Sequence, residues 1–304
     1  MLAGVALVTL VLAGCGSSAD DAKPGSDGST GANANNGGSS NGTPNGGSPN
    51  RGGSNANGQS GGPGSGSSFG PTYFRFGVNG GYYGPGIDRR ESAQISVAAG
   101  VASLRTTLPE YYLEKWGDEI ETQDYAYYET LGLGHHVCFL NGPTAAHSNA
   151  PAGAQDWELA HYSPKNLYEP IFKADGSVNP DNYWAAYVER VVKNYGQYLD
   201  IYEVWNEPDQ VGGNWQATEA WDKSPPKPAD LVWWNDSVFA YIRMLRITYE
   251  VVHQLDDDAA VTTGGIGYGS FLAALLRYTD EPKAGAVSAE YPKTGGKYLD
   301  IVSY

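Results

Sequence analysis

Short apolar segments alternate with helix-like segments along residues 71–304, and this alternation leaves few possible folds. Six segments have the β-branched and aromatic composition of buried strands, at 74–79, 102–108, 135–140, 201–205, 259–263 and 299–304. Between them, apolar spacing and flanking residues predict helices at 88–99, 124–131, 184–195, 238–252 and 271–276. Such an order favours a parallel α/β sheet, either open and doubly wound or closed as a barrel.

The sequence of the turn after the first predicted strand distinguishes between these two folds. Doubly wound nucleotide-binding sheets carry a glycine-rich phosphate loop at this point, directly before a helix. Here Asn79-Gly80-Gly81 leads to Tyr82-Tyr83 and not to a helix start. We therefore expect a (β/α)8 TIM barrel that is incomplete, with about six of the eight βα units present in residues 71–304.

The first 70 residues differ in composition from the rest. Residues 1–14 form an apolar run that ends in small residues, which is typical of an export signal. Residues 15–70 are rich in Gly, Ser and Asn and lack the apolar side chains that a core requires. They are predicted to be a flexible linker between this signal and the folded part.

The run Leu12-Ala13-Gly14-Cys15 resembles the lipobox of bacterial lipoproteins. The resemblance implies cleavage before Cys15 and lipid on its sulfur, so that the protein is anchored to a membrane of the cell envelope. An ordinary secretory signal with a chance cysteine is the alternative.

Charge and cysteine content limit the partners. The formal net charge is −15, which disfavours nucleic acid as a partner. Two cysteines are too few for a disulfide framework or a Cys-rich zinc site. We expect a monomer without metal or cofactor.

The sequence Trp205-Asn206-Glu207-Pro208 follows the fourth predicted strand, at the rim where parallel barrels carry their active sites. Pro208 disfavours helical dihedral angles at Glu207, so we expect the strand conformation to continue through this residue. Strand alternation then places Glu207 on the side of Trp205 and Glu203, with Asn206 turned away unless the strand kinks. A carboxyl group beside an indole loses hydration, which favours its protonated form and suits it to protonating a glycosidic oxygen.

The segment from Tyr202 to Asp209, YEVWNEPD, resembles the fourth-strand motif of glycoside hydrolase clan A, the retaining (β/α)8 glycosidases. This resemblance implies that Glu207 is the general acid/base and that Asn206 binds the sugar 2-hydroxyl. Arg105 would keep a partner carboxylate ionised, and Trp205 would lie at the substrate. The final segment LDIVSY is similar to the sixth strand of the clan, which makes Tyr304 a substrate-site candidate.

In this clan the nucleophile comes from a seventh strand. No glutamate here matches that position, since Glu281 and Glu290 precede the sixth predicted strand. We therefore expect the sequence to be a fragment of a longer retaining glycoside hydrolase, and the 304-residue chain to be inactive. The predicted substrate is a polysaccharide or oligosaccharide, with Trp215 as the best candidate for stacking on a sugar.

Two other functions stay open. The chain could be a non-catalytic glycan-binding surface lipoprotein on a glycosidase-like barrel, or a barrel hydrolase of different chemistry that uses Glu110 or Asp209. His135, His136 and Cys138 are predicted to be structural. Glu203 is predicted either to pair with Arg105 or to be solvated at the bottom of the barrel.

Overall fold

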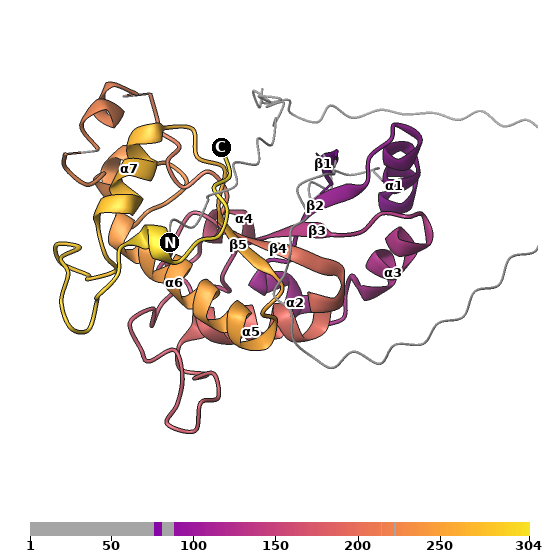
Figure 1. The fold of residues 1–304 in the computed structure, drawn as a ribbon, viewed down its shortest axis with the longest axis horizontal. Coiled ribbons are helices and arrows are strands. Elements are labelled where there is room, and N and C mark those ends of the chain that lie inside the picture. The colour runs from indigo at the N-terminus through magenta and orange to yellow at the C-terminus, as the bar shows by residue number, and fades with distance from the viewer. Residues whose placement is uncertain (1–75, 81–87, 214, 222) are drawn as a thin grey trace, which may run out of the picture. The chain divides into compact units, whose positions relative to one another are not determined.

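A five-stranded parallel sheet organises the fold (Figure 1). The computed structural model describes residues 76–80, 88–213, 215–221 and 223–304. The strands follow one another in the order of the chain, and each pairs in parallel with the next: β1 (Gly77–Asn79), β2 (Ser103–Thr107), β3 (His136–Leu140), β4 (Leu199–Val204) and β5 (Ala260–Thr263). A doubly wound sheet reverses its strand order, and this sheet does not. The fold is therefore an incomplete (β/α)8 barrel, as predicted.

Several predictions concern residues outside the described part. The signal at 1–14, Cys15, the linker at 15–70 and the pair Tyr82-Tyr83 all lie there.

Helices connect the strands. They are α1 (Arg89–Ala98), α2 (Glu110–Trp116), α3 (Thr122–Thr130), α4 (Asp156–Leu159), α5 (Tyr183–Tyr195), α6 (Val238–Leu255) and α7 (Gly269–Arg277). Four 3₁₀ turns are also described: η1 (Gly196–Tyr198), η2 (Trp215–Ala220), η3 (Pro228–Asp230) and η4 (Gly295–Lys297). The helices α2 and α4 were not predicted, because seven and four residues are too few to show a helical apolar period.

Helix α5 begins at Tyr183, one residue before the predicted start at 184. Asn179-Pro180-Asp181 has the composition of a cap followed by a first turn, but the cap is Asn182, whose Oδ1 accepts from the backbone N–H of Ala185 at 3.1 Å. Asn179 instead closes the preceding turn by accepting from the N–H of Asp181 at 3.2 Å. Both asparagines can cap a backbone, so their order along the chain did not decide between them.

The predicted sixth strand at 299–304 is reduced to a single parallel bridge, which joins Thr262 to Ile301. Beyond it, the N–H of Ser303 donates to the side-chain Oγ1 of Thr263 at 3.2 Å and not to a backbone carbonyl. The ladder therefore ends after one bridge, although the segment lies beside β5 as predicted.

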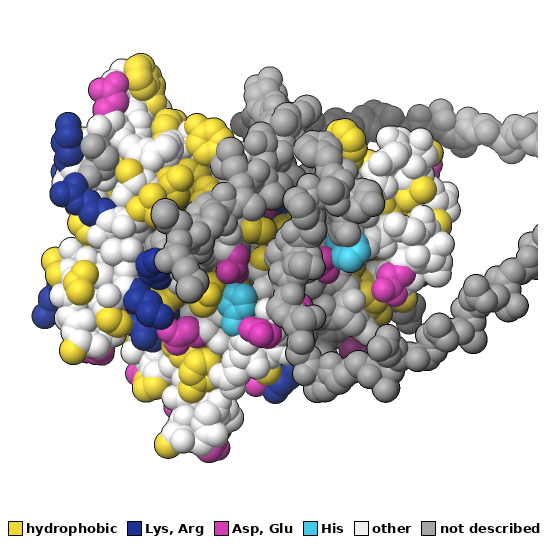
Figure 2. Space-filling view, in the orientation of Figure 1, with side chains coloured by type: hydrophobic (Ala, Val, Ile, Leu, Met, Phe, Trp, Pro, Cys, Tyr) yellow, Lys and Arg dark blue, Asp and Glu magenta, His cyan; other side chains and the backbone are white. Residues whose placement is uncertain are grey.

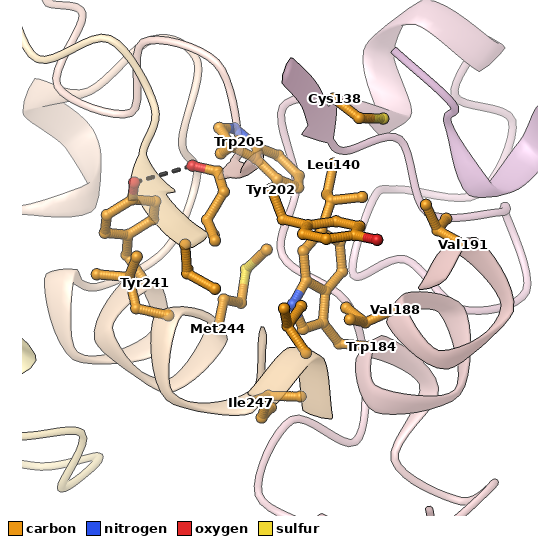
Figure 3. Packing of buried hydrophobic residues seen from close by; sticks show 14 of the residues in the cluster. Cys138, Leu140, Trp184, Val188, Val191, Tyr202, Trp205, Tyr241, Met244 and Ile247 are labelled. Atoms are coloured by element: carbon orange, nitrogen blue, oxygen red, sulfur yellow. Dashed lines mark hydrogen bonds between the residues drawn. The ribbon is translucent and has the colours of Figure 1, made fainter. Parts of the chain in front are cut away.

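The main core lies between the sheet and the pair α5 and α6, which pack side by side (Figure 1). Figure 3 shows Trp184 of α5, Tyr202 of β4 and Tyr241 of α6 in this core, with Met244 drawn between Tyr241 and the other two rings; all three rings are fully buried. Their polar atoms are mostly paired, since Trp184 Nε1 donates to Thr248 Oγ1 at 3.0 Å and Tyr241 Oη donates to the Val204 carbonyl at 2.9 Å. Burying each such ring contributes on the order of 2 kcal/mol.

Alternate residues of the strands face away from the helices. Thr106 points to the helical side, where its Oγ1 meets Tyr125 Oη of α3 at 2.5 Å. Its neighbours Arg105 and Thr107 therefore face the barrel interior. Register places Thr107, Phe139, Glu203 and Thr262 in one row across β2 to β5, so this interior is largely polar.

The two histidines and the cysteine of the third strand differ in their surroundings. His136 and Cys138 are fully buried, and the ring of His136 packs against Tyr125 and Tyr128. Burial lowers the pKa of His136 to about 4, and its Nδ1 accepts from the backbone N–H of Leu104. His135 is exposed and pairs with Asp200. These contacts are structural, as predicted.

The visible surface in Figure 2 carries its Lys and Arg side chains mainly on the side where α7 lies, with acidic side chains between them. None of the helices in the described part has both the length and the hydropathy to cross a bilayer.

Candidate active site

The backbone turns sharply where β4 ends. Trp205 has φ of 68° and Glu207 has φ of 45°, so both adopt the left-handed conformation that side chains other than glycine rarely take. The prediction that the strand continues through Glu207 is wrong. Two such residues within three positions store strain, which is typical of functional sites.

Gly264, directly after β5, leaves room for this turn. A Cβ atom at Gly264 would lie 2.9 Å from the carbonyl oxygen of Trp205 and 3.0 Å from Pro208 Cδ. The N–H of Gly264 donates to the Val204 carbonyl at 2.9 Å, so the two strand ends are held together by backbone contact. The turn therefore depends on glycine at this position.

The kink brings Asn206 to the interior side, into contact with a buried ion pair. Arg105 Nε and Nη2 donate to the two carboxylate oxygens of Glu203 at 2.7 and 2.8 Å. Nη2 also donates to Asn206 Oδ1 at 2.8 Å. Because the guanidinium has donors only, it fixes the amide orientation and leaves the Asn206 NH₂ group for another partner.

This pairing settles the role of Glu203. Arg105 neutralises Glu203, and its expected contact with a partner carboxylate on a further strand stays a prediction. The N–H of Gly265 donates to the same Glu203 carboxylate at 3.2 Å, and Phe139 lies under the guanidinium with its ring centre 4.1 Å away. Glu203 is thus part of a buried network and is not solvated at the bottom of the barrel.

Trp205 does not line a substrate site. Its side chain is 1% exposed and points into the core beside Trp184 (Figure 3). Its Nε1 donates to the carbonyl of Trp233 at 2.7 Å, and its ring packs on the edge of Trp234. The left-handed conformation at Trp205 reverses the side that simple alternation predicts, so the substrate contact proposed for this indole is wrong.

Glu207 is half-buried, and its carboxylate accepts no hydrogen bond from any residue that the structure describes. Nearby, Asp209 is buried and accepts from the N–H of Tyr268 at 2.8 Å. Burial raises the pKa of Asp209 to about 6, and the charge of Glu207 adds to this shift. The site therefore offers an unengaged carboxyl group at Glu207 beside the oriented amide of Asn206.

The remaining candidates lie apart from this group or have other partners. Trp215 is 56% exposed at the start of η2, and Tyr304 is 60% exposed. In the described part, neither makes a hydrogen bond or ring contact with Arg105, Asn206 or Glu207.

Glu110 is already engaged. It is buried and accepts from the Thr144 N–H at 2.9 Å, and it meets His147 Nδ1 at 2.7 Å. Glu110 and Asp209 thus both have structural partners, so neither shows the open carboxylate that the alternative hydrolase requires.

No group of three or more His, Cys, Asp or Glu side chains placed to hold a metal ion occurs within the described ranges. A hollow of about 620 Å³ opens between α2, the segment that follows it and α5, lined by residues that include Trp116, Asp118 and Arg190. It contains none of the motif residues.

Sequence reasoning missed Gly264 and Gly265 as parts of the site, and it named Asp209 only for the alternative hydrolase. Gly264-Gly265 directly follows a predicted strand, where a close backbone approach is common, so this pattern could have found them. Nothing in the sequence indicated the burial of Asp209.

Comparison with known proteins adds fold likeness only. No family model and no curated protein matches this chain. Among solved structures, an endo-1,4-β-mannanase from Eisenia fetida is 12% identical with a TM-score of 0.40, over 64% of this chain and 58% of that one. A family 39 glycoside hydrolase from Bacteroides cellulosilyticus WH2 is 17% identical with a TM-score of 0.34, over 60% of this chain and 30% of that one.

A GH30 xylanase C catalytic domain from Talaromyces cellulolyticus is 13% identical with a TM-score of 0.39, over 66% of this chain and 48% of that one. Alignments to these three structures thus span between 30% and 58% of their lengths. Such likeness says nothing about catalysis, so the function below is argued from the site itself.

Proposed function

We propose that this chain contributes the acid/base half of a retaining O-glycoside hydrolase. The observation that carries the proposal is the Glu207 carboxyl group, half-buried and unengaged by described residues, on a strained turn at the carboxyl end of β4. Carboxyl ends of barrel strands are where TIM-barrel enzymes place their chemistry.

In the proposed reaction Glu207 protonates the glycosidic oxygen as the bond to the leaving sugar breaks. A second carboxylate attacks the anomeric carbon, and Glu207 then takes a proton from the water that releases the sugar. Asn206 donates from its NH₂ group to a hydroxyl oxygen of the sugar, in the orientation that Arg105 fixes. We assign the attacking role to no described carboxylate near Glu207, because Glu203 is neutralised by Arg105 and Asp209 is bonded to Tyr268.

The test is Glu207→Gln in the full-length protein, with aryl β-glycosides and soluble β-glucan, xylan and mannan as substrates. Loss of the acid is expected to lower turnover of the polysaccharides by roughly 10²- to 10⁴-fold. Aryl glycosides with a dinitrophenolate leaving group need no protonation, so their glycosylation step is expected to suffer less. Equal activity of Glu207→Gln and wild type on all substrates would refute the proposal.

A non-catalytic glycan-binding role is the second candidate, favoured by the exposed aromatic side chains. It predicts that the full-length protein binds a hexasaccharide but hydrolyses none of the substrates above.

We further propose export and lipid attachment at Cys15, supported by the Leu12-Ala13-Gly14-Cys15 run. Labelling of the protein with a palmitate analogue in a bacterial host, compared with Cys15→Ser, tests this: label on both variants alike would refute attachment at Cys15.

A further inference from the structure

Three aromatic side chains from two loops form one group, which we call the aromatic platform: Trp157 of α4, His161 and Trp233. The rings of His161 and Trp233 are nearly parallel, with an interplanar angle of 8° and centres 6.0 Å apart. Trp157 stands edge-on to His161 at 5.8 Å and is 64% exposed. Exposing this much of a tryptophan costs hydrophobic free energy, so a group of aromatic rings at this surface calls for an explanation.

The platform adjoins the segment that carries Glu207. Val211 forms an antiparallel bridge with Leu231, and the N–H of Val232 donates to the carbonyl of Gln210 at 2.8 Å. Trp233 directly follows Val232, so its backbone lies next to the segment that leads from Glu207 to Val211. The carbonyl of Trp233 also accepts from Trp205 Nε1, which fixes its backbone to the motif.

A second set of contacts holds the other loop in place. The N–H of Asn235 donates to the carbonyl of His161 at 2.8 Å, and Ser163 Oγ donates to Asp236 Oδ2 at 2.5 Å. The two loops are therefore joined just after Trp233, and the platform is fixed before any ligand arrives.

The charges around the platform select the ligand. Three acidic residues, Asp156, Glu158 and Asp236, flank the platform. Among described residues, only Asp156 of these three forms an ion pair with a Lys or Arg, namely with Lys115 at 4.0 Å. Burial lowers the pKa of His161, which favours the uncharged form of its ring. An anionic chain would be repelled by these carboxylates.

We propose that the aromatic platform binds the sugar units of a neutral polysaccharide next to the bond that Glu207 protonates. Pyranose rings with equatorial substituents present flat C–H faces, which pack on indole rings, while their hydroxyls reach the neighbouring carboxylates. The inference rests on the proposed function and deepens it, because it makes the substrate a neutral chain of several sugars and not a small glycoside.

The experiment is isothermal titration calorimetry of the protein with hexasaccharides of β-1,4-linked glucose, xylose and mannose, and with hexagalacturonate as the anionic probe. At least one neutral hexasaccharide is expected to bind, and Trp157→Ala is expected to weaken that binding roughly tenfold. Trp157→Phe, which keeps an aromatic face, is expected to restore part of the affinity. The exposed position of Trp157 means that its variants keep the fold, which circular dichroism verifies.

Trp116→Ala is the matched control, since Trp116 is also about half exposed (52%) but lines the hollow by α2. The platform is overturned if Trp157→Ala binds like wild type, if only Trp116→Ala weakens binding, if hexagalacturonate binds as tightly as the neutral chains, or if no hexasaccharide binds. The proposed function fails separately, when hydrolysis by the full-length protein does not depend on Glu207.

Discussion

Arg105 and Glu203 stand 98 positions apart in the chain and meet as a two-fold hydrogen-bonded ion pair inside the sheet, at 2.7 and 2.8 Å. Both side chains are almost completely buried. Two charges removed from water are stable only together, so each residue requires the other. The same guanidinium holds Asn206, which links the stability of the barrel interior to the orientation of the site.

Glu203→Gln is expected to destabilise the fold by about 3–5 kcal/mol, because it removes the negative charge that Glu203 places against the buried Arg105. The double variant Arg105→Met/Glu203→Leu is expected to lose less, since both charges are removed together. Urea denaturation followed by fluorescence measures both. Asp200→Asn, in the exposed pair with His135, is the control and is expected to cost less than about 1 kcal/mol. A cost for Glu203→Gln as small as that of the control would contradict the pairing.

Gly264→Ala is expected to destabilise the protein by about 1–3 kcal/mol, because the added methyl group would press on the Trp205 carbonyl at 2.9 Å. Gly267→Ala, three residues along the same loop, is the matched control, since nothing lies within 4 Å of its Cβ position. Thermal unfolding of the two variants compares them directly. Equal melting temperatures would show that the close approach at Gly264 does not constrain the turn.

Asp209 gives stability a pH dependence with a definite sign. Its pKa is raised from 3.8 to about 6 by burial, so the protonated form favours the folded state. This contribution is fully present below about pH 4 and is lost as the pH rises through about 6. Between pH 4 and pH 8, wild type is expected to lose on the order of 2–3 kcal/mol relative to Asp209→Asn.

Chemical denaturation at several pH values measures this difference. The exposed Asp258→Asn provides the comparison and is expected to follow wild type. Because the charge of Glu207 raises the pKa of Asp209, Glu207→Gln is expected to lower that pKa, as carboxyl chemical shifts would show. A difference between wild type and Asp209→Asn that does not change with pH would refute the shift.

Asp280 is fully buried between Arg243 and Arg246, at 3.2 and 3.1 Å. Asp280→Asn is expected to cost about 3–5 kcal/mol because two guanidinium groups lose their shared counter-charge. Glu250→Gln removes a half-buried helical partner of Arg246 and is expected to cost at most about 0.5 kcal/mol. Calorimetric unfolding that ranks the two variants equally would be inconsistent with this network.

The sequence predicts the elements of this fold better than the details of its site. Periodicity located α5 and α6, because long amphipathic helices repeat their apolar residues several times. It could not locate α4, which has four residues, and therefore gave no reason to single out Trp157. The family resemblance placed Arg105 near the site, but its pairing with Glu203 depends on register across β2, β3 and β4, which no local pattern contains.

The turn at the motif shows the same limit. Pro208 argued for an extended Glu207, whereas the contact between Gly264 and the Trp205 carbonyl, 59 residues apart, accompanies a left-handed one. The side of the sheet that each motif residue faces depends on this tertiary contact, which the local sequence does not show. The sequence therefore assigned Trp205 to the substrate, whereas its side chain packs in the core.

Because Glu207 has a left-handed conformation, screening variants for folding and screening them for activity should favour different residues at position 207. Glycine is the residue best suited to that backbone, so a library screened only for soluble, protease-resistant protein should tolerate or enrich glycine at position 207. A library screened for sugar release should reject it. Sequencing the two screened libraries would thus show glutamate retained for activity at a position whose backbone conformation favours glycine.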